Sequence, residues 1–245
     1  MNKAIFNWSG GKDSSLALHH LMRTKEYDIR YLVTSVNEKF QRISMHGVRL
    51  ELLKEQAESI GIPLHMIMMP EMPTMEIYDG LMAGTLKRFK GEGIDHAVFG
   101  DIFLEDLKKY REERLARAGM RGVFPIWKKD SLDLVQEFID QGFKAVLVCV
   151  DEKVLDRSFA GRPIDAQLLK DFPKNVDPCG ENGEYHSFVY DGPIFRRPVR
   201  FDFGEVVHRD YAPPGTATAA VCPGPAASPQ VHTGFWYSDL VPVEI

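Results

Sequence analysis

The strongest constraint on the fold of this chain is a regular alternation of short apolar runs with segments of helical spacing over its first 150 residues. The apolar runs are short and bounded by turn residues, which is typical of strands buried on both faces. Leu18, Leu21 and Met22 illustrate the helical spacing between the first two runs. The expected strands are 4–8, 31–36, 65–69, 97–100 and 145–150, and the expected helices are 14–25, 48–60, 75–90 and 132–139.

Strands that alternate with helices form βαβ units, so this pattern predicts a parallel sheet with flanking helices. The crossover connections of such units are almost always right-handed, which leaves few topologies. Open parallel sheets bind their ligands beyond the carboxyl ends of the strands. We therefore expect a ligand between the loop after 4–8 and the turn after Phe99, in contact with the second strand near Ser35.

The second half of the chain has a different character. Residues 188–193 predict a strand and a turn, and 199–207 predict a strand pair bent near Gly204. Residues 212–231 are rich in Pro, Ala, Gly and Thr, which is typical of a linker, and 235–237 are expected to return as a strand. The predicted parts are a parallel α/β domain at 1–125, a smaller mixed α+β domain at 126–211, and a linker with a C-terminal strand at 212–245.

Composition excludes several classes of protein. The formal net charge of −5 argues against an extended nucleic-acid surface. The 3 cysteines show no CxxC spacing, so they indicate neither a zinc site nor a disulfide framework, and they favour a reduced setting. Glycine and charge interrupt the N-terminal apolar run too early for a signal peptide, and no run has the length of a membrane span. We expect a cytoplasmic protein.

A short string between the first expected strand and the first helix has the features of a phosphate-binding loop. Consecutive glycines let the backbone turn tightly and approach an anion. The free N–H groups and the positive dipole end of the following helix attract phosphate. Asp13 would repel phosphate unless Mg²⁺ bridges the two, so it is a candidate metal ligand and catalytic residue. The loop residues expected to bind a nucleotide are Ser9, Gly10, Gly11, Lys12, Asp13 and Ser14.

This string is not the GxxxxGK[ST] loop of the best-known nucleotide-binding proteins. A structural alternative is a glycine-rich turn from strand to helix with a Ser or Asp cap. The complete string at the end of the first strand favours the functional interpretation, in which the loop holds the β- and γ-phosphates of ATP.

The string resembles the pyrophosphate loop of the N-type ATP pyrophosphatases, a group that includes GMP synthetase, asparagine synthetase and tRNA-modifying enzymes. The resemblance implies a five-stranded parallel sheet with flanking helices, an adenine nucleotide alpha hydrolase-like fold, in agreement with the alternation above. It also implies cleavage of ATP between the α- and β-phosphates. A substrate oxygen is adenylated, pyrophosphate leaves, and a nucleophile displaces AMP.

Three further segments are similar to one branch of this group, the diphthine–ammonia ligases. They are 34–49, 98–114 and 177–188, and the last contains the string GENGEYHS. The resemblance spans about residues 3–200, with Asn182 at a position where a glycine often stands and with no counterpart for 212–231. It implies that Ser35, His46, Gly100 and Asp101 help to bind ATP and that Asp13, Glu181, Glu184 and His186 are catalytic.

The implied activity is that of an ATP-dependent amide-forming ligase. A substrate carboxylate attacks the α-phosphorus, Mg²⁺ offsets charge on the leaving pyrophosphate, and ammonia aminates the acyl-adenylate. Ammonia must arrive unprotonated, so a base is expected, and Glu181, Glu184 and His186 remain alternatives. The implied acceptor is a carboxylate such as diphthine on an elongation factor, whose trimethylammonium group suits nearby carboxylates and Tyr185. Free ammonium is the implied nitrogen source, because the sequence has no glutaminase signature.

Structural interpretations remain open for these segments. His46 could bond a backbone carbonyl at a helix start, 105–117 suits a solvated helix face with charge pairs, and 180–184 suits a polar turn. Two functional alternatives also remain. A tRNA-modifying enzyme of the same superfamily needs a basic groove or paired cysteines, which the composition does not supply. A regulatory module that binds ATP without chemistry has no need of Asp13 or of the acidic residues in 181–184. Homodimer formation is left open.

Overall fold

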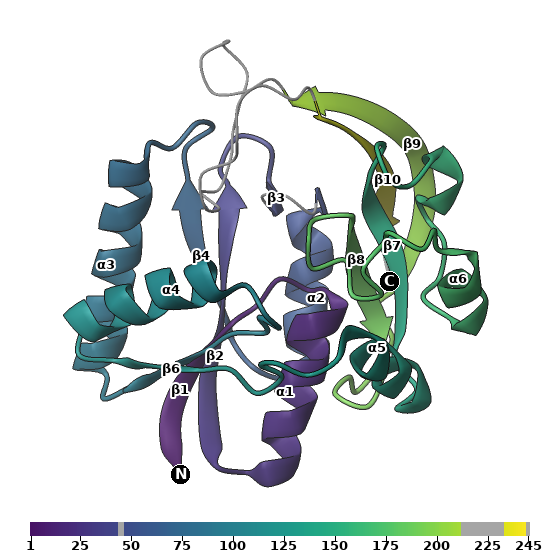
Figure 1. The fold of residues 1–245 in the computed structure, drawn as a ribbon. Helices are drawn as coiled ribbons and strands as arrows, with labels where there is room; N and C mark the ends of the chain where they lie inside the picture. The colour runs from purple at the N-terminus through teal and green to yellow at the C-terminus, as the bar shows by residue number, and fades with distance from the viewer. Residues whose placement is uncertain (44–46, 212–232, 244–245) are drawn as a thin grey trace.

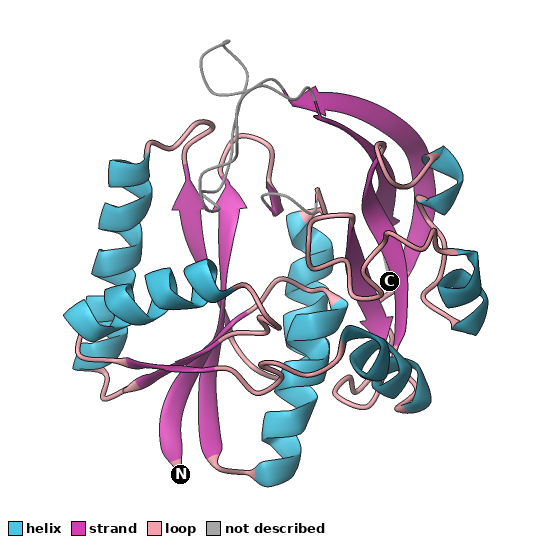
Figure 2. Cartoon of the chain, viewed as in Figure 1, coloured by secondary structure: helices cyan, strands magenta, loops and turns pink. Residues whose placement is uncertain are grey.

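The computed structural model describes residues 1–43, 47–211 and 233–243. Two β-sheets stand side by side, with helices between them and on their outer faces (Figures 1 and 2). Up to the last strand of the first sheet, the elements are β1 (Asn2–Asn7), α1 (Lys12–Thr24), β2 (Tyr27–Asn37), β3 (Arg42–Ile43), α2 (Leu50–Ile60), β4 (Leu64–Met69), α3 (Met75–Gly91), β5 (His96–Val98), α4 (Glu105–Arg117) and β6 (Arg121–Val123).

The first sheet has six strands and is mixed. β1 pairs in parallel with β2 and β5, β2 pairs in parallel with β4, and β5 pairs in parallel with β6. The short β3 pairs antiparallel with the end of β2, beyond the point where β1 stops. The predicted parallel pairing is therefore confirmed, whereas a purely parallel sheet is wrong because β3 adds an antiparallel strand.

Helices cover both faces of the first sheet, as the buried strands require. Ala4 and Phe6 on β1 pack in one hydrophobic cluster with residues of α1 and α2. Ile5, which points to the opposite face, packs in a second cluster with Phe89 of α3 and Leu115 of α4. The first cluster continues into the second sheet, so α1 and α2 lie between the two sheets (Figure 1).

Two strand assignments made from the sequence need correction. The run 145–150 continues the alternation but forms β7 (Lys144–Asp151), which pairs antiparallel with β8 (Tyr185–Asp191) and β10 (Thr233–Pro242) in the second sheet. The end of the parallel sheet is formed instead by β6, which was not expected. Its sequence, Arg121-Gly122-Val123, contains no apolar run, and it becomes a strand through its pairing with β5. Periodicity indicates a strand but not its partner.

The second sheet is antiparallel in the order β8-β7-β10-β9. The predicted strand pair at 199–207 is wrong, because β9 (Phe201–Tyr211) is one strand through Gly204. The expected final strand at 235–237 lies within β10 (Thr233–Pro242), while the predicted linker at 212–231 lies outside the described residues. The remaining elements are α5 (Ser131–Asp140), η1 (Arg157–Phe159), α6 (Ala166–Asp171) and β8 (Tyr185–Asp191).

Within the described part of the chain, none of the helices combines the length and the apolar content that crossing a membrane would need.

Candidate active site

The loop between β1 and α1 is fixed by contacts from other elements. Gly10 has φ of +78°, and a Cβ at this position would lie 2.7 Å from Gln56 Oε1, so the turn requires glycine. Gln56 on α2 accepts a hydrogen bond from the Trp8 indole at 2.9 Å. Its amide donates to the carbonyls of Gly10 at 3.0 Å and Val189 at 2.5 Å. Gln56 therefore ties the loop to α2 and to β8.

Hydroxyl and amide groups gather at the start of α1. The Ser9 and Ser14 hydroxyls lie 3.0 Å apart, and Ser14 donates to the Gly11 carbonyl at 2.9 Å. The Gly11 N–H donates to Ser9 Oγ at 3.3 Å, and Gly11, the N-cap residue, has no side chain to cap the helix. The first turn of α1 thus offers backbone N–H groups and the positive end of its dipole, which is the geometry of an anion site.

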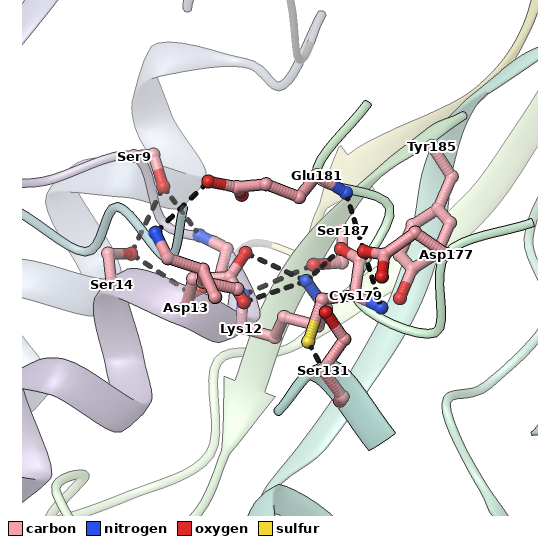
Figure 3. A network of polar contacts seen from close by, with 12 residues as sticks. Ser9, Lys12, Asp13, Ser14, Ser131, Asp177, Cys179, Glu181, Tyr185 and Ser187 are labelled. Carbon is pink, nitrogen blue, oxygen red and sulfur yellow. Dashed lines mark hydrogen bonds and ion pairs between the residues drawn. The ribbon is translucent and has the colours of Figure 1, made fainter. Parts of the chain in front are cut away.

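Lys12 lies at the centre of the polar network (Figure 3). Its buried ammonium donates to both carboxylate oxygens of Asp13, at 2.8 and 2.7 Å, and to the Cys179 carbonyl. The same ammonium lies 5.3 Å from the centre of the Tyr185 ring, and the Lys12 N–H donates to Ser187 Oγ at 3.1 Å. Burial opposes the charge, but the adjacent Asp13 carboxylate raises the pKa of Lys12 well above its ordinary value. The loop therefore holds a buried cation.

The turn after β5 lies directly against this loop. A Cβ on Gly100 would lie 2.9 Å from the Ser14 backbone nitrogen, so only glycine allows the close approach. Asp101 follows, with 9% of its surface exposed, and forms an ion pair with Arg111 of α4, with Nε and Oδ2 2.9 Å apart. Burial raises the pKa of Asp101, Arg111 opposes the rise, and Asp13 adds to it. The structure thus brings Gly100 and Asp101 to the phosphate loop, where the sequence placed them.

Glu181 reaches from the second half of the chain to the same place. Its Oε1 accepts a hydrogen bond from the Ile102 N–H at 3.0 Å, and Ile102 directly follows Asp101 in the chain. Burial raises the pKa of Glu181 to about 7, and the negative charges of Asp13 and Asp101 contribute. Glu181 is therefore a carboxylate that gains and loses a proton near neutral pH beside the loop.

Glu184, which was expected to act in the same way, is directed into its own segment. It is 6% exposed, and its Oε1 accepts from the Asp177 N–H at 2.9 Å and from the Asn182 side chain at 3.1 Å. Its Oε2 accepts from the Asn182 N–H at 3.0 Å. The asparagine at position 182 thus helps to fold the segment around Glu184, and the carboxylate shapes the turn that presents Glu181.

Glu184→Gln is expected to lower the free energy of unfolding by about 1–3 kcal/mol, because an amide N–H would replace one of two buried acceptors and leave a backbone donor unpaired. Urea unfolding followed by circular dichroism measures the change. Glu58→Gln is the matched control, since Glu58 is exposed and pairs only with the exposed Arg197. Equal stability of the two variants would contradict a buried structural role for Glu184.

His186 points away from the network. Tyr185 and Ser187, its neighbours on β8, both contact Lys12, and alternate residues of a strand point to opposite faces. His186 is half-buried and pairs in register with Cys149 on β7. The structure therefore brings Glu181, but not the His186 side chain, to the phosphate loop.

The two remaining expected residues belong to the neighbouring strand and turn. Ser35 lies on β2, two residues beyond Val33, whose carbonyl accepts a hydrogen bond from the Trp8 N–H at 2.8 Å. It is half-buried near the carboxyl end of the strand. His46 lies outside the described residues, so its predicted contact with ATP stays a prediction.

Three contributors to the site were not expected from the sequence, namely Gln56, Arg111 and Ser187. Gln56 gave a usable signal, because it shares a helical face with the buried Leu52 and Ile60 and a polar residue on such a face needs partners. Arg111 was grouped with the solvated charges of its helix. Ser187 accepts a hydrogen bond from the Lys12 N–H, but the two residues are far apart in the sequence, so no local pattern predicts this contact.

Comparison with known proteins agrees with the resemblance found in the sequence. The N-terminal domain of diphthamide synthase matches residues 2–122, and its C-terminal domain matches residues 130–211. A Danio rerio protein named diphthine–ammonia ligase is 31% identical to this chain, over 53% of this chain and 54% of that protein. A Bos taurus protein of the same name is also 31% identical, over 42% of this chain and 41% of that protein. The human relative is 25% identical over 69% of this chain and 67% of its own length. The chain thus matches about half the length of the first two relatives. It belongs to the diphthamide synthase family.

Proposed function

We propose that this chain is an ATP-dependent ligase that adenylates a substrate carboxylate, releases pyrophosphate and forms an amide with ammonia, as the names of its relatives suggest. The observation that carries the proposal is the junction of the phosphate loop with Glu181. An uncapped helix start, a buried ammonium and three carboxylates meet at one sheet edge. Binding of ATP alone has no need of a carboxylate that titrates near neutral pH.

ATP is proposed to lie across the carboxyl ends of β1, β2 and β5. Its β- and γ-phosphates would contact the loop 9–14, where the N–H groups of α1 and the Lys12 ammonium supply positive charge. The nucleoside would extend between the turn at Gly100 and the end of β2 near Ser35. Residues 1–125 would then hold the nucleotide, and 126–211 would present the acceptor.

The carboxylates at the site suit Mg²⁺. Asp13, Asp101 and Glu181 influence one another electrostatically, and oxygen ligands of this kind are those that Mg²⁺ prefers together with substrate phosphates. Asp13 is the proposed protein ligand, with Asp101 as a second carboxylate nearby. Bound Mg²⁺ would offset the charge that develops on pyrophosphate.

Glu181 is proposed as the base of the amination step. Its carboxylate would accept a proton from ammonium, the nitrogen lone pair would attack the acyl carbon, and the bond to AMP would break. Because the pKa of Glu181 is about 7, a large share of this side chain is ionised near neutral pH, and the ionised form is basic enough to accept a proton. The Glu181 carboxylate would also favour an acceptor that carries a quaternary ammonium group, such as diphthine on an elongation factor, whereas Tyr185 is buried against Lys12 and is not expected to contact the acceptor.

The test is a direct measurement of products. The protein is incubated with ATP, Mg²⁺, ammonium and candidate carboxylates, including an elongation factor that carries diphthine, and AMP and pyrophosphate are quantified. We expect AMP formation that depends on both ammonium and the carboxylate. AMP formation that depends on tRNA would favour the tRNA-modifying alternative, and ATP binding without AMP under every condition would favour a regulatory module.

A further inference from the structure

Arg111 is the strongest unassigned feature beside the proposed active site. Its guanidinium contacts both oxygens of the Asp101 carboxylate, with Nε 2.9 Å from Oδ2 and Nη2 3.1 Å from Oδ1. The Arg111 guanidinium also lies over the Phe99 ring, with its Cζ 4.4 Å from the ring centre. One hydrogen bond, from Nη2 to Oδ1, a second close charge contact and an aromatic support hold the guanidinium beside the Asp101 carboxylate.

The contact between Arg111 and Asp101 affects the phosphate loop because Asp101 lies directly beside it. Gly100 is packed against the backbone of Asp13 and Ser14, so the next residue cannot move away from the loop without opening that contact. The Asp101 carboxylate is buried, and the charge of Asp13 acts on it unfavourably. A buried carboxylate beside another carboxylate needs a cation, and Arg111 supplies it from α4.

We propose that Arg111 is a positioning residue that holds the Asp101 carboxylate in a fixed orientation beside the phosphate loop, where it supports binding of Mg·ATP. This inference rests on the proposed function. Arginine suits the role because its planar fork matches a carboxylate and its charge is permanent, whereas lysine offers a single point of contact. Arg111 itself is not expected to touch the nucleotide, since its guanidinium is engaged by Asp101 and Phe99.

The next arginine on the same face of α4 provides a matched control. Arg114 forms an ion pair with Asp79 and lies over the Tyr110 ring at 4.2 Å. The side chains of Arg111 and Arg114 are 27% and 23% exposed, so their burial is similar. Arg114 differs in that its carboxylate partner is on α3 rather than next to the phosphate loop. Arg111→Met and Arg114→Met thus remove equivalent interactions, one linked to the proposed site and one not.

The experiment measures Mg·ATP binding by calorimetry and AMP formation for Arg111→Met, Arg111→Lys, Arg114→Met, Asp101→Asn and the double variant Asp101→Asn with Arg111→Met. We expect Arg111→Met to weaken Mg·ATP binding and to raise the KM for ATP about tenfold, which corresponds to about 1.4 kcal/mol. Arg111→Lys should recover part of the loss, and Arg114→Met should bind Mg·ATP as the unchanged protein does. In the Asp101→Asn background, Arg111→Met should have no further effect on binding.

Multiplicative losses in the double variant, or an equal loss in Arg114→Met, would overturn the proposal, because Arg111 would then not act through Asp101. Urea unfolding of all five variants identifies any general loss of stability. Arg111→Lys keeps the charge and remains informative if Arg111→Met does not fold. Absence of AMP formation in the unchanged protein would count against the proposed function alone, since calorimetry still tests the link between Arg111 and Mg·ATP binding.

Discussion

Asp13→Asn is expected to reduce AMP formation about 10²–10³-fold, the usual loss when a preorganised electrostatic group is removed from an active site. The substitution removes the proposed Mg²⁺ ligand and the anion that holds the Lys12 ammonium through two contacts of 2.8 and 2.7 Å. Ser14→Ala is expected to act in the same direction, because Ser14 Oγ closes the turn through Gly11 and contacts Ser9. Steady-state rates at saturating ammonium measure both effects. Full AMP formation in both variants would contradict the phosphate-loop assignment.

The same substitution has a separate effect on stability. Lys12 is 3% exposed, and Asp13→Asn would leave its charge buried without a carboxylate. Removing one partner of a buried ion pair typically costs about 3–5 kcal/mol of unfolding free energy. Asp28→Asn is the matched control, because its pair with Arg30 is exposed and surface pairs contribute little. Urea unfolding distinguishes the two. An activity loss with unchanged stability would mean that Lys12 finds another anion.

Local sequence patterns predicted the parts of the site that depend on one segment. The loop could be recognised because an apolar strand, two glycines and a helix follow one another without interruption, and the structure places Gly10 at a positive φ. The turn at Gly100 could be expected because parallel strands end at a common sheet edge. In both cases a few adjacent residues in the sequence determine both the type of side chain and the secondary-structure element that positions it.

Contacts between distant segments could not be predicted in this way. Glu181 accepts from the Ile102 N–H and Lys12 donates to the Cys179 carbonyl, and neither pairing leaves a periodic trace in the sequence. Arg111 could not be distinguished among the charged residues of α4. In the sequence, an arginine that pairs with a buried carboxylate has the same helical spacing as an arginine exposed to solvent. β6 was missed for a related reason, since its partner β5 rather than its composition makes it a strand.

Lys12 connects the two halves of the proposed reaction. It belongs to the phosphate loop, but the Cys179 carbonyl and the Tyr185 ring that surround its ammonium come from the segment that presents Glu181. A phosphate group that attracts Lys12 would alter the contacts of this segment. Nucleotide binding and the orientation of Glu181 are therefore expected to be coupled through one side chain.

Glu181→Gln is expected to lower amide formation about 10²–10⁴-fold, the range in which a general base contributes, while Mg·ATP binding changes far less. Burial and the charge of Asp13 raise the pKa of Glu181 to about 7, so the unprotonated base is lost as the pH falls below 7. The rate of the unchanged protein should then fall about tenfold for each further pH unit. Glu113→Gln is the control, because Glu113 is an exposed carboxylate on α4.

The measurement compares initial rates of amide formation from pH 5.5 to about 8.5 in steps of about half a unit, a range chosen to bracket the titration of the base. Glu181→Gln lacks the base and depends on free ammonia, whose fraction rises about tenfold with each pH unit in this range, whereas the unchanged protein can draw on ammonium, whose fraction is nearly constant. The ratio of unchanged protein to Glu181→Gln should therefore stay level below a pH of about 7 and fall at higher pH, where the Glu181 carboxylate is ionised and the rate of the unchanged protein no longer rises. A ratio that stays constant across this range would remove Glu181 as the base, even if the variant is slow, and would leave it with a structural role at the Ile102 N–H.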